Sequence, residues 1–204
     1  HTEAVKILLE HGATIPVERN PYQIPLVHAA INNKPELVEI LLKFKADPNN
    51  GQPLFYTHSS PAVRPLLLEA GADPKAIFEL EGDYGDKVLH FCLLAHAAQE
   101  DKPEAVAFWL EYGLDPNGIG TIPPILSAVY NGNPESVRLL LEKGADPNYI
   151  LNSDRNFLRT DIYANKPLIE YAKGLVSDKN DPLEKSRSSQ VVRLLEKAIA
   201  EKKP

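Results

Sequence analysis

The chain has 204 residues but no methionine, and its only cysteine is Cys92. A single thiol cannot form a disulfide within the chain, so a reducing compartment is favoured over export. We therefore expect an intracellular protein, cytoplasmic or nuclear. Because the first residue is His1 rather than methionine, we also expect the chain to be a piece of something longer.

Long apolar runs are missing as well. No stretch approaches the roughly 20 consecutive apolar residues that cross a bilayer, and no secretory signal pattern opens the chain. We therefore expect no membrane insertion. The formal net charge is −6, with the excess of acids in residues 1–150 and a net basic segment in 151–204. An acidic surface repels a phosphate backbone, so nucleic acid is not the expected partner.

Repetition is what the sequence has in plenty. One phrase, a leucine-rich helix end followed by a turn, occurs five times and recurs about every 33 residues on average. Its copies are LLEHGATIP (8–16), LLKFKADPN (41–49), LLLEAGADP (66–74), WLEYGLDPN (109–117) and LLLEKGADPN (139–148). A second phrase lies upstream of four of these turns and occurs once more near the C-terminus. Its copies are IPLVHAA (24–30), QPLFYTH (52–58), KVLHFCL (87–93), PPILSAV (123–129) and KPLIEYA (166–172).

Proline and glycine are in phase with the two phrases. Proline is favoured at the first position of a helix, because it has no N–H to leave unpaired there and its φ is preset. The expected first residues of first helices are Pro25, Pro53, Pro124 and Pro167, and those of second helices are Pro35, Pro61, Pro103 and Pro134. Glycines that can adopt positive φ follow the second helices at Gly12, Gly71, Gly113 and Gly144. In the second copy of the turn Lys45 takes this position, so we expect a positive φ there.

A unit of about 33 residues with a TPLHxAA-like helix start and an LLLxxGAD helix end resembles the ankyrin repeat, over essentially the whole chain. The resemblance implies an all-α solenoid of helix-turn-helix units with hairpin-like loops, forming one domain over 1–204. It contains five to six repeats, the first partial and the last a capping repeat with an inserted polar stretch at 177–189. The expected boundaries are 1–19, 20–49, 50–74, 75–117, 118–148 and 149–204.

Three details of single repeats are predicted as well. His90 takes the histidine position of the TPLH phrase, which implies a buried structural histidine. The first helix after residue 87 is expected to be about five residues longer than the family norm. Pro65 falls within the second helix of the shortest repeat, 50–74, where an interior proline would weaken the helix.

No catalytic or metal-binding pattern stands out. Cys92 and His96 are four residues apart and can share a helix face, but two ligands do not make a closed zinc site. No phosphate-binding glycine loop, hydrolase elbow or kinase motif occurs. We therefore expect no enzyme, no cofactor and no bound metal.

Two long loops depart from the repeat and are candidates for recognition, because extra residues at loop tips are not needed for stacking. Segment 75–87 mixes acids with apolar residues, and 149–166 contains arginine and aromatic residues. Candidate contacts in them are Phe78, Leu80, Glu81, Asp83, Tyr84, Arg155 and Phe157. The alternative for both is a solvent-exposed loop that packs on itself.

The ankyrin resemblance implies a concave binding surface built from loop tips and first helices. Positions that match this surface are Tyr22, Ile31, Asn32, Ser59, Ser60, Tyr130 and Asn131. The leading hypothesis is therefore a protein–protein interaction module or scaffold, whose partner contributes a basic, partly apolar segment to the 75–87 loop. The alternative is a regulatory or targeting segment of a larger enzyme or receptor whose activity lies outside this chain. Catalysis by the array itself would need a pocket of converging titratable groups. The oligomeric state stays open.

Overall fold

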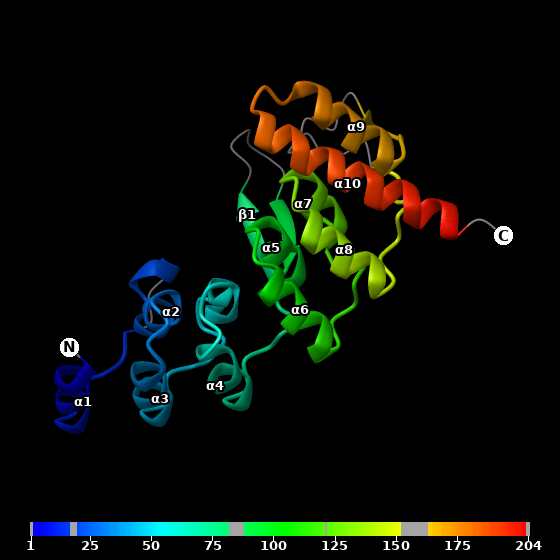
Figure 1. Ribbon diagram of the computed structural model, residues 1–204. Helices are drawn as coiled ribbons and strands as arrows, with labels where there is room; N and C mark the ends of the chain where they lie inside the picture. Colours follow the sequence, from blue (N-terminus) through cyan, green and yellow to red (C-terminus); the bar gives the residue numbers. More distant parts are fainter. Residues whose placement is uncertain (1, 17–19, 82–87, 121, 152–162, 203–204) are drawn as a thin grey trace. The chain divides into compact units, whose positions relative to one another are not determined.

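The computed structural model describes residues 2–16, 20–81, 88–120, 122–151 and 163–202; of residues 80, 81, 88 and 89 it describes the backbone. The chain forms two compact units, His1–Ala76 and Ile77–Pro204, called unit 1 and unit 2 below. Both are built mainly from short helices, as Figure 1 shows. The single domain over 1–204 expected from the sequence stays a prediction.

Unit 1 contains antiparallel helix pairs and two short 3₁₀ helices. In chain order these are α1 (Thr2–Glu10), η1 (Pro21–Gln23), α2 (Pro25–Ile31), α3 (Pro35–Lys43), η2 (Pro53–Thr57) and α4 (Val63–Glu69). Helix α2 packs against α3 and η2, while α3 packs against α1 and α4. The core is formed by the small and branched residues that the repeats place at the same positions, among them Leu26, Val27, Ala29, Ala30, Val38 and Leu41.

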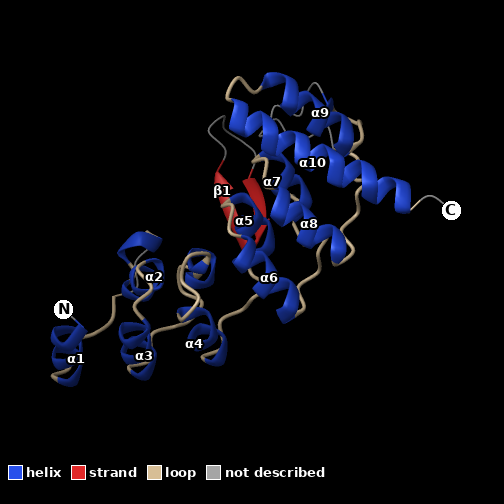
Figure 2. Ribbon diagram, viewed as in Figure 1, coloured by secondary structure: helices blue, strands red, loops and turns tan. Residues whose placement is uncertain are grey.

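Unit 2 opens with a hairpin and continues with three helix pairs. Its elements are β1 (Ile77–Glu81), β2 (Val88–Cys92), α5 (Leu93–Gln99), α6 (Pro103–Tyr112), α7 (Pro124–Tyr130), α8 (Pro134–Glu142), α9 (Leu168–Asp178) and α10 (Pro182–Glu201). The two strands are antiparallel and pair Phe78 with Phe91 and Glu79 with His90. Figure 2 shows the strands beside the helices; β2 and α7 both pack against α5, and α10 packs against α8 and α9.

The predicted helix starts are confirmed at five prolines. Each is the first residue of its helix, where the missing N–H leaves no intrahelical bond unmade. They are Pro25, Pro35, Pro103, Pro124 and Pro134. The polar stretch predicted as an insertion is partly helical, because α10 already begins at Pro182, where Asp181 caps the N–H groups of Leu183 and Glu184.

The second helices end in the same left-handed turn. Gly12, Gly71, Gly113 and Gly144 have φ between 90° and 99°, and Lys45 has φ 66°, as predicted. One residue later the backbone N–H bonds back to a helix carbonyl five residues earlier, as in Ala46 to Leu41 at 2.9 Å and Ala145 to Leu140 at 2.9 Å. This motif satisfies carbonyls that the end of a helix would otherwise leave unpaired.

The DPN turns connect one repeat to the next. Within a turn, the Asp47 carboxylate accepts the N–H of Asn49 at 2.9 Å. The Asn49 amide then donates to the carbonyl of Gly71 at 3.1 Å, and its oxygen accepts the N–H of Asp73 at 2.8 Å. In unit 2 the oxygen of Asn117 accepts the N–H of Asp146 in the same way, at 2.9 Å. The aspartate thus shapes its own turn, and the asparagine reaches the following turn of the same unit.

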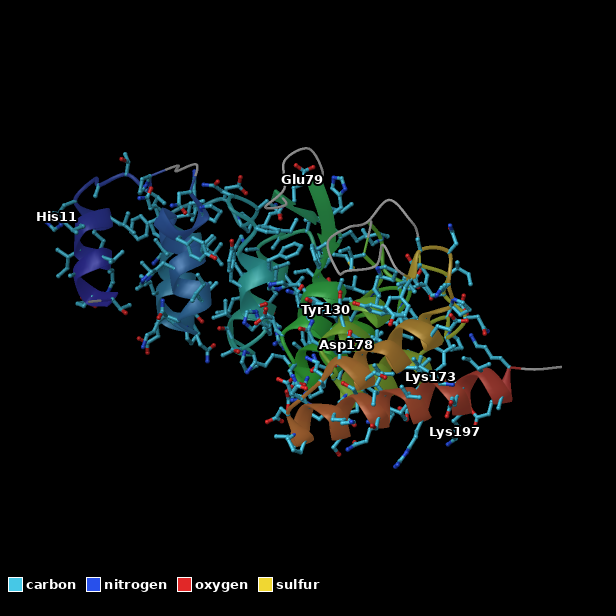
Figure 3. The ribbon with its side chains drawn as sticks, turned by 90° about the horizontal axis from the view of Figure 1, so that it is seen from above. His11, Glu79, Tyr130, Lys173, Asp178 and Lys197 are labelled. Carbon is cyan, nitrogen blue, oxygen red and sulfur yellow. The ribbon has the colours of Figure 1, made fainter. Side chains whose placement is uncertain are left out.

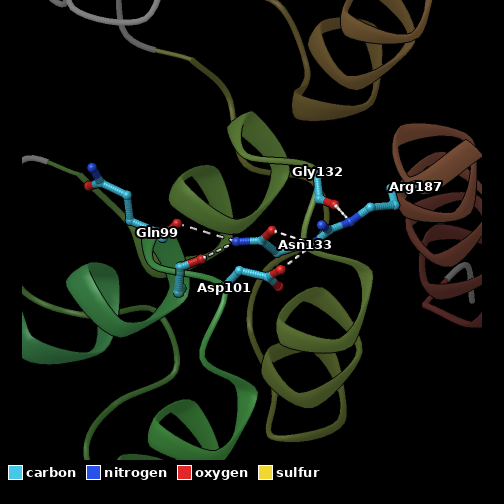
Figure 4. Close-up of polar contacts among 6 residues, drawn as sticks. Gln99, Asp101, Gly132, Asn133 and Arg187 are labelled. Carbon is cyan, nitrogen blue, oxygen red and sulfur yellow. Dashed lines mark hydrogen bonds and ion pairs between the residues drawn. The ribbon is translucent and has the colours of Figure 1, made fainter. Parts of the chain in front are cut away.

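The last helix is held by a polar network, drawn in Figure 4. Asn133 is buried and donates to the carbonyl of Ala98 at 2.8 Å. Arg187 of α10 donates from Nε to the carbonyl of Gly132 at 3.1 Å, and from Nη2 to Asn133 Oδ1 at 3.0 Å and to Asp101 Oδ2 at 2.6 Å. One guanidinium therefore ties α10 to the turns that follow α5 and α7.

Two predictions for the 50–74 repeat are wrong. Its first helix is not an α-helix but the short 3₁₀ helix η2, and its second helix begins at Val63 rather than at Pro61. Pro65 is therefore the third residue of α4, where an N–H has no intrahelical acceptor to lose. The expected weakening by an interior proline does not arise.

The predictions for residues 87–99 are also wrong. The extra residues do not lengthen the first helix, because they form β2, and α5 has 7 residues. His90 lies on this strand, partly exposed, with its Nε2 3.3 Å from Glu79 Oε1. The repeat phrase is LLAHAA at 93–98, so His96 matches His28 of PLVHAA in α2. The TPLH-like pattern that ends at His90 therefore places the repeat phrase six residues too early in the sequence.

The base of the 149–166 loop is closed by backbone bonds. Leu151 donates to Lys166 at 3.0 Å, and Asn165 donates to Leu151 at 2.8 Å. Tyr163 precedes α9, and its ring centroid is 5.2 Å from that of Tyr171 on α9 in an edge-to-face arrangement. The hydroxyl of Tyr163 occupies the space into which a Cβ at Gly174 would project.

We predict that Lys45→Gly is neutral or raises the free energy of unfolding by up to about 1 kcal/mol, because glycine adopts positive φ without strain. Lys43→Gly, in the last turn of α3, is the control and should lower it by about 1 kcal/mol. Urea unfolding measures both. A clear loss of stability in Lys45→Gly would contradict the prediction.

We predict that Gly174→Ala destabilises the protein by about 1–3 kcal/mol, because the new methyl group overlaps Tyr163. Glycine to alanine within a helix normally stabilises it by about 1 kcal/mol. The sign should therefore reverse in a Tyr163→Ala background, where the obstruction is gone. Thermal or urea unfolding of the four proteins tests this, and stabilisation in both backgrounds would refute the packing.

Candidate protein-binding surface

Two exposed apolar side chains occupy the same repeat position. Ile31 is the last residue of α2 and Tyr130 the last residue of α7, and each is 38% exposed. Each is followed by an asparagine that closes its helix: Asn32 donates to the carbonyl of His28 at 2.8 Å, and Asn131 donates to that of Ser127 at 3.1 Å. The asparagine amides thus cap helices, while Ile31 and Tyr130 keep large apolar areas in water.

Tyr22 extends this surface in unit 1. It belongs to η1, is 66% exposed and meets Tyr56 of η2 edge to face, with ring centroids 5.7 Å apart. Burial raises the pKa of Tyr56 from its ordinary value of 10.0 to about 12, and the neighbouring Tyr22 adds to the effect. The two rings therefore form an aromatic pair of which Tyr22 is the accessible member.

The turn after η2 separates the two predicted serines. Ser59 is exposed, as expected for a contact residue. Ser60 is fully buried, with its Oγ 3.5 Å from the carbonyl oxygen of Ile31, so its expected place on the surface is wrong. The Ser60 contact places the turn after η2 against the end of α2, beside Ile31.

In unit 2 the corresponding surface lies on α7 and α9, which pack against each other. Tyr130 of α7 has Lys173 as its counterpart on α9, and both are labelled in Figure 3. Burial raises the pKa of Tyr171, and the neighbouring Tyr130 and Tyr163 raise it further. Tyr171 of α9 is thus buried and meets Tyr163 edge to face, and Tyr130 belongs to the helix that packs against α9.

The hairpin carries part of the predicted acidic loop. Phe78 is half-buried and pairs across the strands with the buried Phe91, while Glu79 is exposed opposite His90, as Figure 3 shows for Glu79. For Leu80 and Glu81 only the backbone, in β1, is described. The remaining candidates, Asp83, Tyr84, Arg155 and Phe157, lie outside the described residues.

Within the described residues, no three or more histidine, cysteine, aspartate or glutamate side chains converge as a metal site would require. Cys92 is buried at the N-terminal cap of α5. Over the same part of the chain, none of the helices combines the length and the apolar character needed to cross a membrane.

Sequence reasoning missed two members of the surface. His28, exposed on α2, and Tyr56 of η2 hold equivalent positions of PLVHAA and PLFYTH, so aligning these phrases residue by residue would have found both. Arg187 gave no such signal, because its partners are more than 50 residues away in the sequence.

We predict that Tyr56 titrates near pH 12, whereas an exposed tyrosine titrates near 10. Because the folded pKa is raised, this group favours the folded state fully below about pH 10, and the effect is lost as pH rises from about 10 to about 12. The difference in absorbance titration between the wild type and Tyr56→Phe measures it. Tyr22→Phe should lower the pKa of Tyr56 only partly, and an ordinary pKa of Tyr56 in the wild type would contradict the burial of the ring.

Comparison with known proteins gives one consistent result. Two family models match, ankyrin repeats (3 copies) over residues 1–78 and ankyrin repeats (many copies) over residues 93–141, which together span more than half of the chain. A search of curated proteins gave no significant match.

Solved ankyrin-repeat structures resemble this chain over nearly its full length. The ankyrin repeat domain of Bcl-3, described as a unique member of the IkappaB family, is 22% identical with a TM-score of 0.65, over 97% of this chain and 79% of that one. The human ASB11 ankyrin repeat domain is 19% identical with a TM-score of 0.67, over 97% and 78%. At this identity the likeness concerns the fold. With the repeat phrases, the paired helices and the family models in agreement, this chain is an ankyrin-repeat protein.

Proposed function

We propose that this protein binds another protein through the exposed side of its first helices. Ankyrin repeat domains are generally protein-interaction modules. The proposed contacts are Tyr22, Ile31 and Asn32 in unit 1 and Tyr130 and Asn131 in unit 2. The observation that carries the proposal is that Ile31 and Tyr130, at one repeat position in two units, each expose 38% of their surface.

The fold itself does not require large apolar side chains at the exposed positions of Ile31 and Tyr130. The amides next to Ile31 and Tyr130 close their helices, so those asparagines have a structural task. The two apolar side chains form none of these bonds, and leaving more than a third of each in water is unfavourable. Large apolar and tyrosine side chains are the usual anchors when a partner covers them. The arrangement therefore favours association over packing as their role.

The acidic hairpin region supports a second, flanking contact. Glu79 is exposed on β1, and Glu81, Asp83 and Tyr84 follow it in the sequence. Carboxylates at this point would attract a basic, partly apolar segment of the partner and raise its association rate. Phe78 and Leu80 belong to the same proposal, as do Arg155 and Phe157 in the second loop. An intracellular location also stays a prediction. The comparisons give no support to a segment of a larger enzyme or receptor.

The test is capture of partners from native extract by the wild-type protein and by variants. We expect Ile31→Ala and Tyr130→Ala to reduce the amount of specifically captured protein by about tenfold, the loss typical of one anchor side chain worth 1–2 kcal/mol. Urea midpoints of both variants should stay close to the wild-type value, because each side chain is exposed at the end of its helix.

Two matched controls separate binding from loss of apolar surface in general. Ile7→Ala on α1 and Tyr112→Ala on α6 remove exposed residues of the same types, 47% and 51% exposed, from other helices. They should capture as much partner as the wild type. Equal capture by all four variants would show that the first-helix surface is not the binding site.

A further inference from the structure

The charged residues of this chain avoid the segments that contain the first helices ahead of α9. The chain has 22 lysine and arginine residues and 28 aspartate and glutamate residues. None of them lies in residues 20–33, 48–63, 88–99 or 116–134. These four segments contain η1 and α2, η2, β2 and α5, and α7, in that order.

Burial does not explain this pattern, because these segments also reach the surface. In unit 1, Tyr22, His28, Ile31, Asn32 and Ser59 are exposed, and Tyr56 is half-buried. We call these six residues the uncharged patch. The ring contact of Tyr22 with Tyr56 joins η1 to η2, and the Ser60 contact joins the turn after η2 to Ile31. The six residues therefore come from elements that contact one another within unit 1.

Other helix surfaces of the protein are charged in the ordinary way. On α8, Arg138 pairs with Glu135 and Glu142, both at 2.5 Å. On α9, Lys173 stands at the position of Ile31 and pairs with Glu196 at 2.8 Å. The guanidinium of Arg64 is close to the uncharged patch in sequence but is buried, and it donates to the carbonyls of Thr57 and His58. It is thus directed into the fold rather than toward a partner.

We propose that the uncharged patch receives a segment of the partner protein that itself carries no charge where it touches the patch. This deepens the proposed function and rests on it. A lysine, arginine, aspartate or glutamate of the partner would lose its water there and find no opposite charge among the six described residues of the patch, which is costly. Apolar side chains can instead cover Ile31 and the Tyr22 ring, while amides and hydroxyls can bond to tyrosine, histidine and asparagine groups. The patch thereby selects against charged segments.

The uncharged patch and the acidic hairpin of unit 2 should differ in how strongly salt affects their contacts. Charge complementarity there favours a basic contact whose rate falls with salt, whereas contact with the uncharged patch should be nearly independent of salt. A partner that uses both would contact the uncharged patch through an uncharged stretch and the hairpin through a basic one.

The test is selection of a random-peptide library, displayed on phage, against the wild-type protein. The selected peptides should contain fewer Asp, Glu, Lys and Arg residues than the unselected library. Their capture should fall at least about tenfold on Ile31→Glu and on Ser59→Glu, because a carboxylate without a counter-ion is then covered. It should be unchanged on Leu8→Glu, a matched substitution at a residue of α1 that is 60% exposed. The affinity of a synthesised peptide from the selected set should change less than about twofold between low and high salt.

The outcomes separate this inference from the proposed function. Peptides that need Ile31 and Ser59 but are as charged as the library, or that bind in a strongly salt-dependent way, overturn the uncharged ligand and leave the binding surface standing. Selected peptides that bind both patch variants as well as the wild type, or a selection that yields no patch-dependent peptide, contradict the binding surface in unit 1 as well.

Discussion

Each repeat of this protein can bury only part of the apolar surface of its two helices, so it is stable only against a neighbour. Within each unit the neighbours are joined at the DPN turns. Asn49 bonds to both Gly71 and Asp73, and Asn117 bonds to Asp146. These amide bridges fix the position of one turn relative to the next, and the helices packed behind them follow. The Arg187 network does the same for the last helix in unit 2.

This division of tasks among the residues leaves side chains of the first helices exposed. Turns, helix caps and bridges use backbone groups and the amides of asparagine, while apolar residues between the helices form the core. Ile31 and Tyr130, exposed at the ends of two first helices, take part in none of the turns, caps and bridges described above, so we infer that their chemistry is set by something else. In unit 1 the side chains of the uncharged patch are aromatic, aliphatic or uncharged polar groups, which is the property on which the proposed recognition depends.

Most of the fold could be predicted because the residues that define a repeat act on neighbours close in the sequence. Proline at a helix start and glycine after a helix end act within one turn, and even the positive φ of Lys45 followed from alignment alone. The errors arose where a local pattern had two solutions. The sequence around His90 resembles a helix start, but these residues pair with β1 and form a strand. Pro65 does not weaken α4, because this helix begins at Val63 and not at Pro61. In the candidate site, Ile31 and Tyr130 are exposed, as expected. The burial of Ser60 and the bonds of Arg187 could not be predicted, because they depend on residues distant in the sequence.

The amide bridge is tested most directly by unfolding Asn49→Ala beside Asn148→Ala. Both asparagines donate a backbone N–H to the aspartate two residues earlier, at 2.9 Å and 3.0 Å, and alanine retains that bond. Among the bonds of the described residues, the Asn49 side chain also joins two turns, through Gly71 and Asp73, and the Asn148 side chain has no such bond. The account predicts that Asn49→Ala lowers the free energy of unfolding by about 1–2 kcal/mol more than Asn148→Ala. Equal losses in the two variants would contradict it.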